Sequence, residues 1–308
     1  MTDKVKDIKY KIRQMYKGIT LDKEKHIYMC DGEVLKAVTR YTDQFKPAFN
    51  TEFAAKGKAE SWNRANPGKP KRTAEWYKRY WKANNKEIRE RGHRVHSYAE
   101  FYPDFPEPRC NKERAIGVWF DLLENKYEVV AQEQKVFSKK YKLAGTIDLL
   151  LINKETGKLV IVDWKSNETH VQRVYKNKKL KKPFTDKENC SLNSYCIQLS
   201  TYQTILEDNG FEVEDLWVVW LKKDRSFTPD ERYTLVDFAN TSEHELYIQY
   251  SIASVKDKLI ENLTEIKVDM KETFLKAARG KKRKSSSYAT KLRKLAGKDR
   301  NSLKKKNK

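Results

Sequence analysis

The sequence predicts an α/β fold with a central mixed sheet, and three observations lead to it. Two runs rich in Ile, Leu and Val, Leu143–Ile152 and Lys158–Lys165, are separated by a five-residue turn, Asn153–Gly157, which indicates a β-hairpin. A third run, Asp215–Leu221, is almost continuously apolar, as strands are when helices cover both faces of their sheet. Segments with helical periodicity precede and follow these runs. For 308 residues, one α/β domain with appendages is the simplest arrangement.

The first predicted elements are a small hairpin and two helices. Asp31 and Gly32 tolerate the positive φ angles of a tight turn, so they would join strands at His26–Cys30 and Glu33–Leu35. The helices are expected at Thr39–Phe45, with Thr39 as the N-cap, and at Phe49–Arg64, which ends before Asn66-Pro67-Gly68.

A long helix is predicted at Thr73–Phe101. Four aromatic residues lie on it at helical spacing, with many Lys and Arg between them: Trp76, Tyr77, Tyr80 and Trp81. Aromatic rings interleaved with cations can stack on bases and pair with phosphates. The favoured interpretation is simpler, namely that the rings pack the helix on the sheet. The cations, including Arg91 and Arg94, could still face a nucleic acid.

The remaining elements follow in order. They are a helix at Asn111–Glu124, a strand at Glu128–Phe137, a long loop at Ser166–Asn193, a helix at Leu192–Asp208, an edge strand at Tyr233–Phe238 and a helix at Ser242–Ala278, which Ser242 and Glu245 begin as a capping box. Residues 1–110 are expected to hold the N-terminal hairpin and helices, packed on a core of residues 111–278. Residues 279–308 are expected to be a disordered basic tail.

The charge balance favours a polyanionic partner. The net charge is +22, and residues 276–308 hold 15 basic residues and one acidic residue. A nucleic acid fits this balance better than a small acidic substrate does. No apolar run is long enough to span a bilayer, and the first residues lack the apolar region of a signal peptide, so an intracellular, cytoplasmic protein is expected, in the host cytoplasm if the chain is phage-encoded.

Charged residues converge at the end of the predicted hairpin. If Ile152 faces Leu159, antiparallel counting puts Asp148 opposite Asp163, and Lys165 two residues further lies on the same face. The surrounding positions are apolar, and two carboxylates in such a place need a counter-charge. A divalent cation held by oxygen ligands, Mg²⁺ or Mn²⁺, is therefore predicted.

Two further features lie near this site in the sequence. Glu133 lies on the strand before the hairpin, but moving the Lys139–Lys142 turn that follows this strand by one residue turns the Glu133 side chain to the other face, so its position stays open. After Lys165, the long loop carries several lysines that could contact DNA: Lys178, Lys179, Lys181 and Lys182.

The segment resembles the core motif of the PD-(D/E)XK nucleases, specifically the RecB-like exonuclease branch of phages and of mitochondrial genome maintenance. The motif residues are Gly145, Asp148 and Asp163-Trp164-Lys165, with Gly92 to His96 as a Gly-x-x-x-His element and Gln198 to Tyr202 as a Gln-x-x-x-Tyr element. The resemblance covers roughly residues 26–221 and implies a restriction-endonuclease-like αβα core. It implies that His96, Asp148, Asp163, the Trp164 carbonyl and a residue such as Glu133 hold the metal.

In this resemblance Lys165 orients or activates water, and Gln198 and Tyr202 orient DNA. Some RecB-like nucleases carry a four-cysteine iron-sulfur cluster. The cysteines here are scattered without a Cys-x-x-Cys pair, so neither such a cluster nor a disulfide framework or zinc site is expected: Cys30, Cys110, Cys190 and Cys196.

The leading hypothesis is thus a metal-dependent DNA exonuclease with a role in recombination, repair or processing of replication ends. Two alternatives remain at this stage. One is a structure-selective endonuclease of the junction-resolvase type, and the other is a non-catalytic nucleic-acid-binding protein that keeps the fold as a scaffold. An intact set of Asp148, Asp163 and Lys165 argues against the second alternative. The sequence gives no strand polarity, no choice between single strands and duplex ends, and no protein partner.

Overall fold

The computed structural model describes residues 3–22, 25, 27–102, 104, 107–123, 125–175, 178–222 and 246–265. Residues 1–259 form one compact unit and residues 260–308 a second. The predicted edge strand Tyr233–Phe238 and the predicted disordered tail both lie outside the described residues. Within those residues, no helix is both long enough and apolar enough to cross a membrane.

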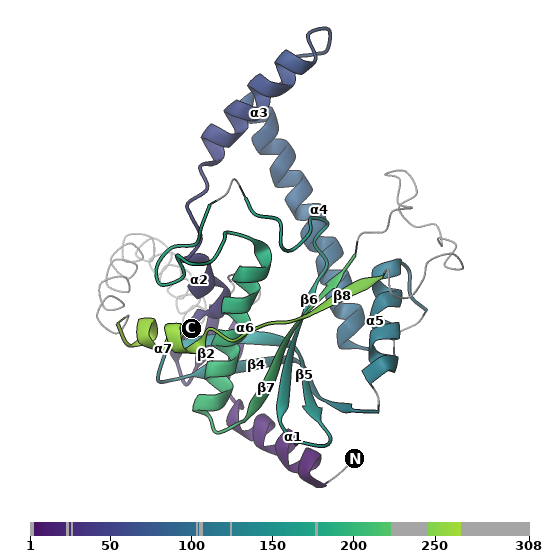
Figure 1. The fold of residues 1–308 in the computed structure, drawn as a ribbon, viewed down its shortest axis with the longest axis vertical. Helices are drawn as coiled ribbons and strands as arrows, with labels where there is room; N and C mark the ends of the chain where they lie inside the picture. The colour runs from purple at the N-terminus through teal and green to yellow at the C-terminus, as the bar shows by residue number, and fades with distance from the viewer. Residues whose placement is uncertain are drawn as a thin grey trace, which may run out of the picture. The chain divides into compact units, whose positions relative to one another are not determined.

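A mixed sheet of eight described strands forms the centre of the first unit (Figure 1). The strands are β1 (Thr20–Asp22), β2 (Ile27–Cys30), β3 (Glu33–Ala37), β4 (Tyr127–Ser138), β5 (Leu143–Asn153), β6 (Leu159–Lys165), β7 (Val213–Leu221) and β8 (Tyr247–Ser251). Their order is β1-β2-β3-β5-β6-β7-β8, with β4 paired to β5 off this path. The pairs β3–β5 and β6–β7 are parallel and the others are antiparallel, so the predicted mixed sheet is confirmed.

The predicted hairpin register is confirmed. Ile152 pairs with Leu159, and the β5–β6 ladder runs from there to the pair Leu149 and Val162. Beyond that pair, β6 no longer pairs with β5 and continues beside β7 alone. The edge of β5 that pairs with β6 at residues 149–152 pairs with β3 at Leu143 and Ala144. Residues 145–148 therefore lie in a fork between two strands that share one edge of β5.

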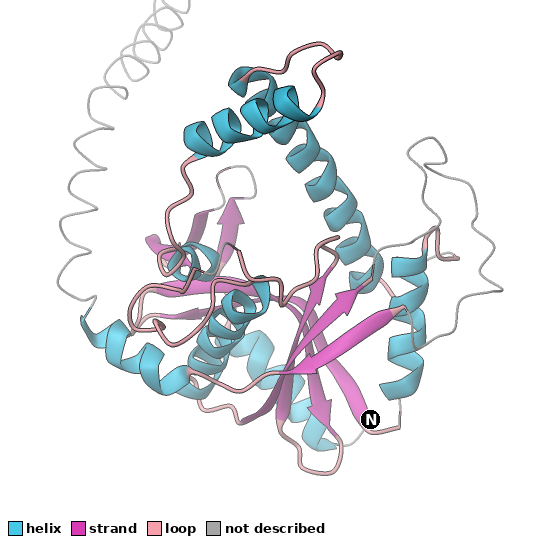
Figure 2. Ribbon diagram, turned by 45° about the horizontal axis from the view of Figure 1, so that its top comes forward, coloured by secondary structure: helices cyan, strands magenta, loops and turns pink. Residues whose placement is uncertain are grey.

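The helices are α1 (Asp3–Met15), α2 (Val38–Asp43), α3 (Thr51–Ala65), α4 (Ala74–Glu100), α5 (Asn111–Leu123), α6 (Ser191–Asp208) and α7 (Lys256–Glu265). The end of α4 and the whole of α5 cover one face of the sheet (Figures 1 and 2). On that face Val95, Ile116 and Trp119 pack on Leu149, Val162 and their neighbours. The alternate strand positions, such as Leu150 and Ile161, are equally buried and face α6 on the other side.

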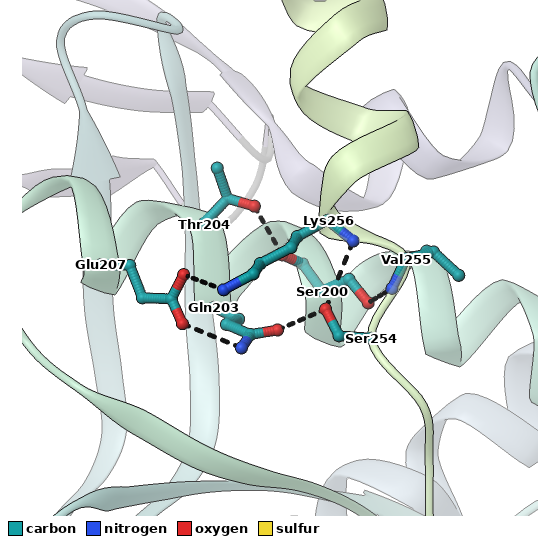
Figure 3. Close-up of polar contacts among 7 residues, drawn as sticks. All are labelled: Ser200, Gln203, Thr204, Glu207, Ser254, Val255 and Lys256. Atoms are coloured by element: carbon teal, nitrogen blue, oxygen red, sulfur yellow. Dashed lines mark hydrogen bonds and ion pairs between the residues drawn. The ribbon is translucent and has the colours of Figure 1, made fainter.

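α6 is held by a polar network as well as by its apolar residues (Figure 3). The Ser200 hydroxyl accepts a hydrogen bond of 3.0 Å from the Val255 backbone N–H, and Ser254 Oγ lies 2.5 Å from Gln203 Oε1. Lys256 Nζ pairs with Glu207 at 2.8 Å. The segment after β8 is therefore fastened along α6, which fixes the position of the helix that carries Gln198 and Tyr202.

The first half of α4 packs on α3 rather than on the sheet. Ala55, Ala59 and Tyr77 are buried in a small core of their own, with Trp62, Trp76 and Trp81 around it. The sequence correctly predicted that rings of this helix pack, but it assigned them to the wrong partner. The predicted helix Thr73–Phe101 is confirmed to within one residue at each end, and Thr73 caps it, since its side chain accepts a 3.1 Å hydrogen bond from the Trp76 N–H.

Three predictions for the fold need correction. A helix at residues 3–15 was not expected, although Val5 and Ile12 on α1 are almost completely buried. The predicted cap Thr39 lies inside α2, which Ala37 precedes without a side-chain cap. Within the predicted helix Ser242–Ala278, residues 247–251 form β8 instead, because they pair with β7 and complete the sheet.

The predicted loop at 166–193 is confirmed up to Cys190, because the described residues of this segment form no helix or strand, and α6 begins at Ser191. Val171, Leu180 and Phe184 are at most 3% exposed, so the described residues of this segment pack on the protein rather than extending into solvent. The Phe184 ring lies against Phe45 at a centroid distance of 5.0 Å. The segment therefore has a fixed course beside α2.

Candidate active site

The fork in the sheet brings the two predicted aspartates together. Where the β5–β6 ladder ends, the Trp164 N–H donates to Asp148 Oδ2 at 2.9 Å, so a carboxylate takes the place of a backbone acceptor. Continuing the register by one residue sets Asp148 across from Asp163. The two strands thus separate at the point where their acidic side chains lie on one face, as the sequence predicted.

Asp163 is buried between a cation and an amide. Its side chain is 4% exposed, and Lys165 Nζ lies 2.6 Å from Asp163 Oδ2. Gln198 Nε2, from α6, donates to Asp163 Oδ1 at 3.4 Å. Among the described residues, no side chain gives Oδ2 a well-aligned hydrogen bond, although the lysine is close. This oxygen is therefore buried, with coordination capacity left over.

His96 and Glu133 complete a second group around Asp148. His96 Nδ1 lies 3.4 Å from Asp148 Oδ2. Ligand atoms of His96, Glu133 and Asp148 all lie within 4.8 Å of one another. Asp163 is not in this group, although the sequence hypothesis put it in the same metal site; it lies next to the group and contacts Lys165 and Gln198.

The register of β4 decides the open question about Glu133. Gln132 pairs with Leu149 and Gln134 with Ile147, which leaves Glu133 opposite Asp148 on the same face. Its φ angle is +47°, a conformation that non-glycine residues rarely adopt and that costs on the order of 1 kcal/mol or more. Such strain beside a cluster of carboxylates is a feature of functional sites.

Tyr202 reaches the site through Gln198. The Tyr202 ring is 2% exposed, so it has no face open to a nucleic acid, and its hydroxyl lies near the Gln198 amide, which acts to lower the pKa of Tyr202 although burial raises it. The ring lies directly over Gly145, where an added Cβ would be 2.6 Å from Tyr202 Cε1. Gly145 thus makes room for the ring, and the ring in turn orients the amide that contacts Asp163. The predicted direct contact between Tyr202 and DNA would need an exposed ring, whereas the ring here is buried over Gly145.

The predicted DNA-binding cations differ in their surroundings. Arg91 is part-exposed and pairs with Glu168 at 3.2 Å, which ties α4 to the segment after β6. Arg94 Nε lies 3.9 Å from Oε1 of Glu113, whose side chain is 2% exposed, so this arginine neutralises a buried acid. The four lysines of the 166–193 segment are exposed: Lys178, Lys179, Lys181 and Lys182.

The titration properties of the cluster follow from burial and mutual charge. Burial raises the pKa of Asp163 to about 6, although Lys165 works in the opposite direction. Burial acts to raise the pKa of Asp148, but its interactions with neighbouring groups, first of all the charge of His96, together have the larger effect, so the pKa of Asp148 is lowered. Burial acts to lower the pKa of His96, but its interactions with neighbouring groups, first of all the charge of Asp148, together have the larger effect, so the pKa of His96 is raised. Burial also acts to lower the pKa of Lys165, but the two aspartates together raise it.

The cluster fits a divalent cation. Two carboxylates and one imidazole have ligand atoms within 4.8 Å of one another, and beside them Asp163 pairs with the ammonium of Lys165. The buried Asp163 Oδ2 lacks an aligned donor, and oxygen-rich sets of this kind suit Mg²⁺ or Mn²⁺. His96, Glu133 and Asp148 have ligand atoms close enough together to hold such an ion, and Asp163 lies beside them.

Two contacts were not foreseen from the sequence. The Lys165 ammonium lies 4.5 Å from the centre of the Tyr195 ring, which shields it on α6. Lys112 Nζ lies 2.5 Å from the Ser166 carbonyl oxygen and holds the chain where it leaves β6. Tyr195 precedes Gln198 by three residues, so helical spacing alone would have placed both on one face of α6.

Comparisons with known proteins agree with this geometry in one respect. The profile of the PD-(D/E)XK nuclease superfamily matches residues 33–282. No curated protein matches the sequence. A solved structure titled "Crystal structure of SSO0001" is similar at 14% identity and a TM-score of 0.25, covering 51% of this chain and 57% of that one. The chain thus spans little more than half of that structure, and a similarity this weak carries no argument.

Proposed function

Because the chain belongs to the PD-(D/E)XK nuclease superfamily, which makes it a metal-dependent nuclease with a nucleic-acid substrate, we propose that it is a DNA exonuclease acting in recombination, repair or processing of replication ends. The observation that carries this proposal is the fork between β5 and β6. There Asp148 and Asp163 lie on one face beside the half-buried Lys165, with His96 and Glu133 close by.

In this proposal His96, Glu133, Asp148 and Asp163 hold Mg²⁺ or Mn²⁺ together with the Trp164 carbonyl. The N–H and C=O of a strand residue point to the same side, and the Trp164 N–H points to Asp148, so its carbonyl faces the same gap. When bound, the cation would polarise the phosphodiester and lower the pKa of an attacking water.

Lys165 acts through its charge rather than as a base. The two aspartates raise its pKa, so it stays protonated at neutral pH. A protonated amine donates hydrogen bonds and can orient a water or stabilise the negative charge that develops on the phosphate. Asp163 keeps the amine in place at 2.6 Å, and Gln198 keeps Asp163 in place.

Two considerations support attack from a DNA end. The Gly-x-x-x-His and Gln-x-x-x-Tyr elements resemble those of a branch made largely of end-processing enzymes. In addition, α4 and the segment after Lys165 lie beside each other near the site, joined by the ion pair of Arg91 and Glu168. The exposed lysines of that segment add phosphate contacts. With α4 and this segment beside it, the approach to the site would admit a strand end more easily than a continuous duplex.

The chemistry is tested by DNA degradation with purified protein. Cleavage should require Mg²⁺ or Mn²⁺ and stop in EDTA, and Asp148→Ala, Asp163→Ala and Lys165→Ala should each reduce it to background. Arg40→Ala serves as a control, since Arg40 donates to the Lys25 carbonyl away from the fork. Cleavage in EDTA, or full activity in all three variants, would contradict the proposal.

The need for an end is tested with linear and covalently closed circular DNA, each single- and double-stranded, under one metal condition. Linear forms should shorten from their ends while circles persist. Rapid loss of circles would reassign the protein as an endonuclease with the same catalytic residues.

A further inference from the structure

The hairpin of α3 and the first half of α4, residues 51–82, is here called the arm. Its buried residues form a core that is separate from the one covering the sheet. In Figures 1 and 2 it extends away from the strands. The buried residues of the arm are therefore not part of the core that packs on β5 and β6, and its exposed side chains can bind a ligand.

Aromatic rings and one guanidinium form a stack along the arm. The Arg72 guanidinium lies 3.5 Å from the centre of the Trp62 ring and 4.2 Å from that of Trp76. Trp76 is stacked with Tyr80 at 5.2 Å and an interplanar angle of 8°. Tyr80 is 50% exposed. The stack thus ends in a ring that is rigidly backed and half open to solvent.

The arm is also strongly basic. It contains nine Lys and Arg residues and three Glu residues. Lys78 pairs with two of these acids, Glu52 and Glu75. The exposed cations of the arm are Lys56, Lys58, Arg64, Lys69, Lys71, Arg79 and Lys82. Phe53 on α3 is 73% exposed among them, which gives a second open ring.

We propose that the arm binds single-stranded nucleic acid, with a base stacked on Tyr80 and the surrounding cations on the phosphates. Exposed rings set among cations are how sequence-independent single-strand binders work, because every base has a face that can stack. A paired base in a duplex hides that face. The proposal rests on the proposed function only in taking the bound strand to be the one that the active site cleaves.

The arm and the active site share one continuous helix. Tyr80 precedes His96 by sixteen residues on α4, which corresponds to about 24 Å along the axis. At roughly 3.4 Å per nucleotide in a stacked strand, this is about seven nucleotides. Strands shorter than about seven nucleotides should therefore reach the active site without touching Tyr80.

The test is fluorescence anisotropy with the full chain in EDTA, on a twenty-nucleotide and a five-nucleotide thymidine strand. Tyr80→Ala should weaken binding of the longer strand about tenfold, the order that loss of one stacked base implies, and leave the shorter one unchanged. Tyr80→Phe, which keeps the ring, should bind as the wild type does. Tyr10→Ala is the matched control, since Tyr10 is 63% exposed on α1. Thermal melts show whether each variant is folded.

Two measurements separate stacking from charge. The log-log salt dependence should be the same for Tyr80→Ala and wild type, because no phosphate contact is lost. A strand of the same length made of abasic sites should bind the wild type no better than it binds Tyr80→Ala. Phe53→Ala provides a second variant if Tyr80→Ala does not fold, with the same expectations.

Equal affinities of wild type and Tyr80→Ala for the long strand would overturn the proposal, as would an equal loss on blunt duplex DNA or in Tyr10→Ala. These outcomes leave the nuclease assignment intact, because that depends on Asp148, Asp163 and Lys165. Conversely, active Asp163→Ala protein with a normal Tyr80 effect would remove the catalytic assignment and keep the binding surface.

Discussion

Gly145 offers a test of how the active site is positioned. A Cβ at this position would lie 2.6 Å from Tyr202 Cε1, 2.8 Å from its hydroxyl and 3.1 Å from Cζ. To restore ordinary van der Waals contact at 3.4 Å, the ring has to retreat by about 0.8 Å. The ring is almost completely buried, so it has little room to do so. Overpacking of this kind typically costs about 1 to 3 kcal/mol of stability.

We expect Gly145→Ala to be less stable by this amount and to lose far more activity than stability. The Tyr202 hydroxyl lies near the Gln198 amide, and Gln198 donates to Asp163, so a displaced ring should move a carboxylate of the site. A displacement near 1 Å in a catalytic geometry costs on the order of a hundredfold in rate. Urea denaturation measures the stability, and single-turnover cleavage of a labelled DNA measures the rate.

Gly92→Ala is the matched control for stability. Its added Cβ would meet only Ser166 Oγ, at 3.5 Å, and Gly92 lies within a helix, where Ala is favoured over Gly by about 0.5 to 1 kcal/mol. The two substitutions should therefore change stability in opposite directions. Replacing Tyr202 by Leu in the Gly145→Ala protein should restore stability without restoring the rate. If Gly145→Ala were as stable and active as the wild type, the contacts that lead from Gly145 to Asp163 would have no effect on stability or on the cleavage rate.

Three further predictions concern the binding of the metal, the Tyr195 ring beside Lys165, and the C-terminal residues 280–308. The pKa values of His96 and Asp163 are both raised, so protonation of these groups stabilises the metal-free fold at low pH, and this contribution is lost as the pH rises through their folded pKa values. Mn²⁺ should therefore bind more tightly as the pH rises from 5 to 7, and its binding should release protons. Calorimetry in two buffers of different ionisation enthalpy detects that release. Tyr195→Phe should keep the ring beside Lys165 and retain activity, whereas Tyr195→Leu should lower kcat; equal rates would show that the ring does not matter. Deleting residues 280–308 should make the salt dependence of DNA binding shallower, by roughly 0.7 to 0.9 ions per lost phosphate contact, and leave kcat unchanged.

The arrangement of Asp148, Asp163 and Lys165 was predictable because it depends on local rules. A strand has a period of two, and once the turn length fixes one pair, every other pair follows. The structure has that register. The position of Glu133 followed the same rule but needed the exact placement of the Lys139–Lys142 turn, which the sequence left open and the pairing of Gln132 with Leu149 settles.

The features that escaped prediction depend on partners far away in the sequence. Arg94 looks like a surface cation until Glu113 is placed beside it, and that acid lies on the next helix. Tyr202 looks like a ligand-facing residue until its ring is seen over Gly145. For residues 247–251, a local capping signal favoured a helix, but pairing with β7 and the bond from Trp119 Nε1 to Gln249 at 2.7 Å overrode it.

The fork at β5 also gives the protein an internal spectroscopic marker. The main-chain proton of Trp164 points at the Asp148 carboxylate, whereas most strand amide protons point at a neighbouring carbonyl. Its magnetic environment therefore follows the charge and ligation of that one side chain. A ¹⁵N-labelled sample would report arrival of an ion as a displaced Trp164 resonance, independently of any substrate. The hydrogen bond between Trp164 and Asp148 at the fork thus makes the occupancy of the metal site directly observable.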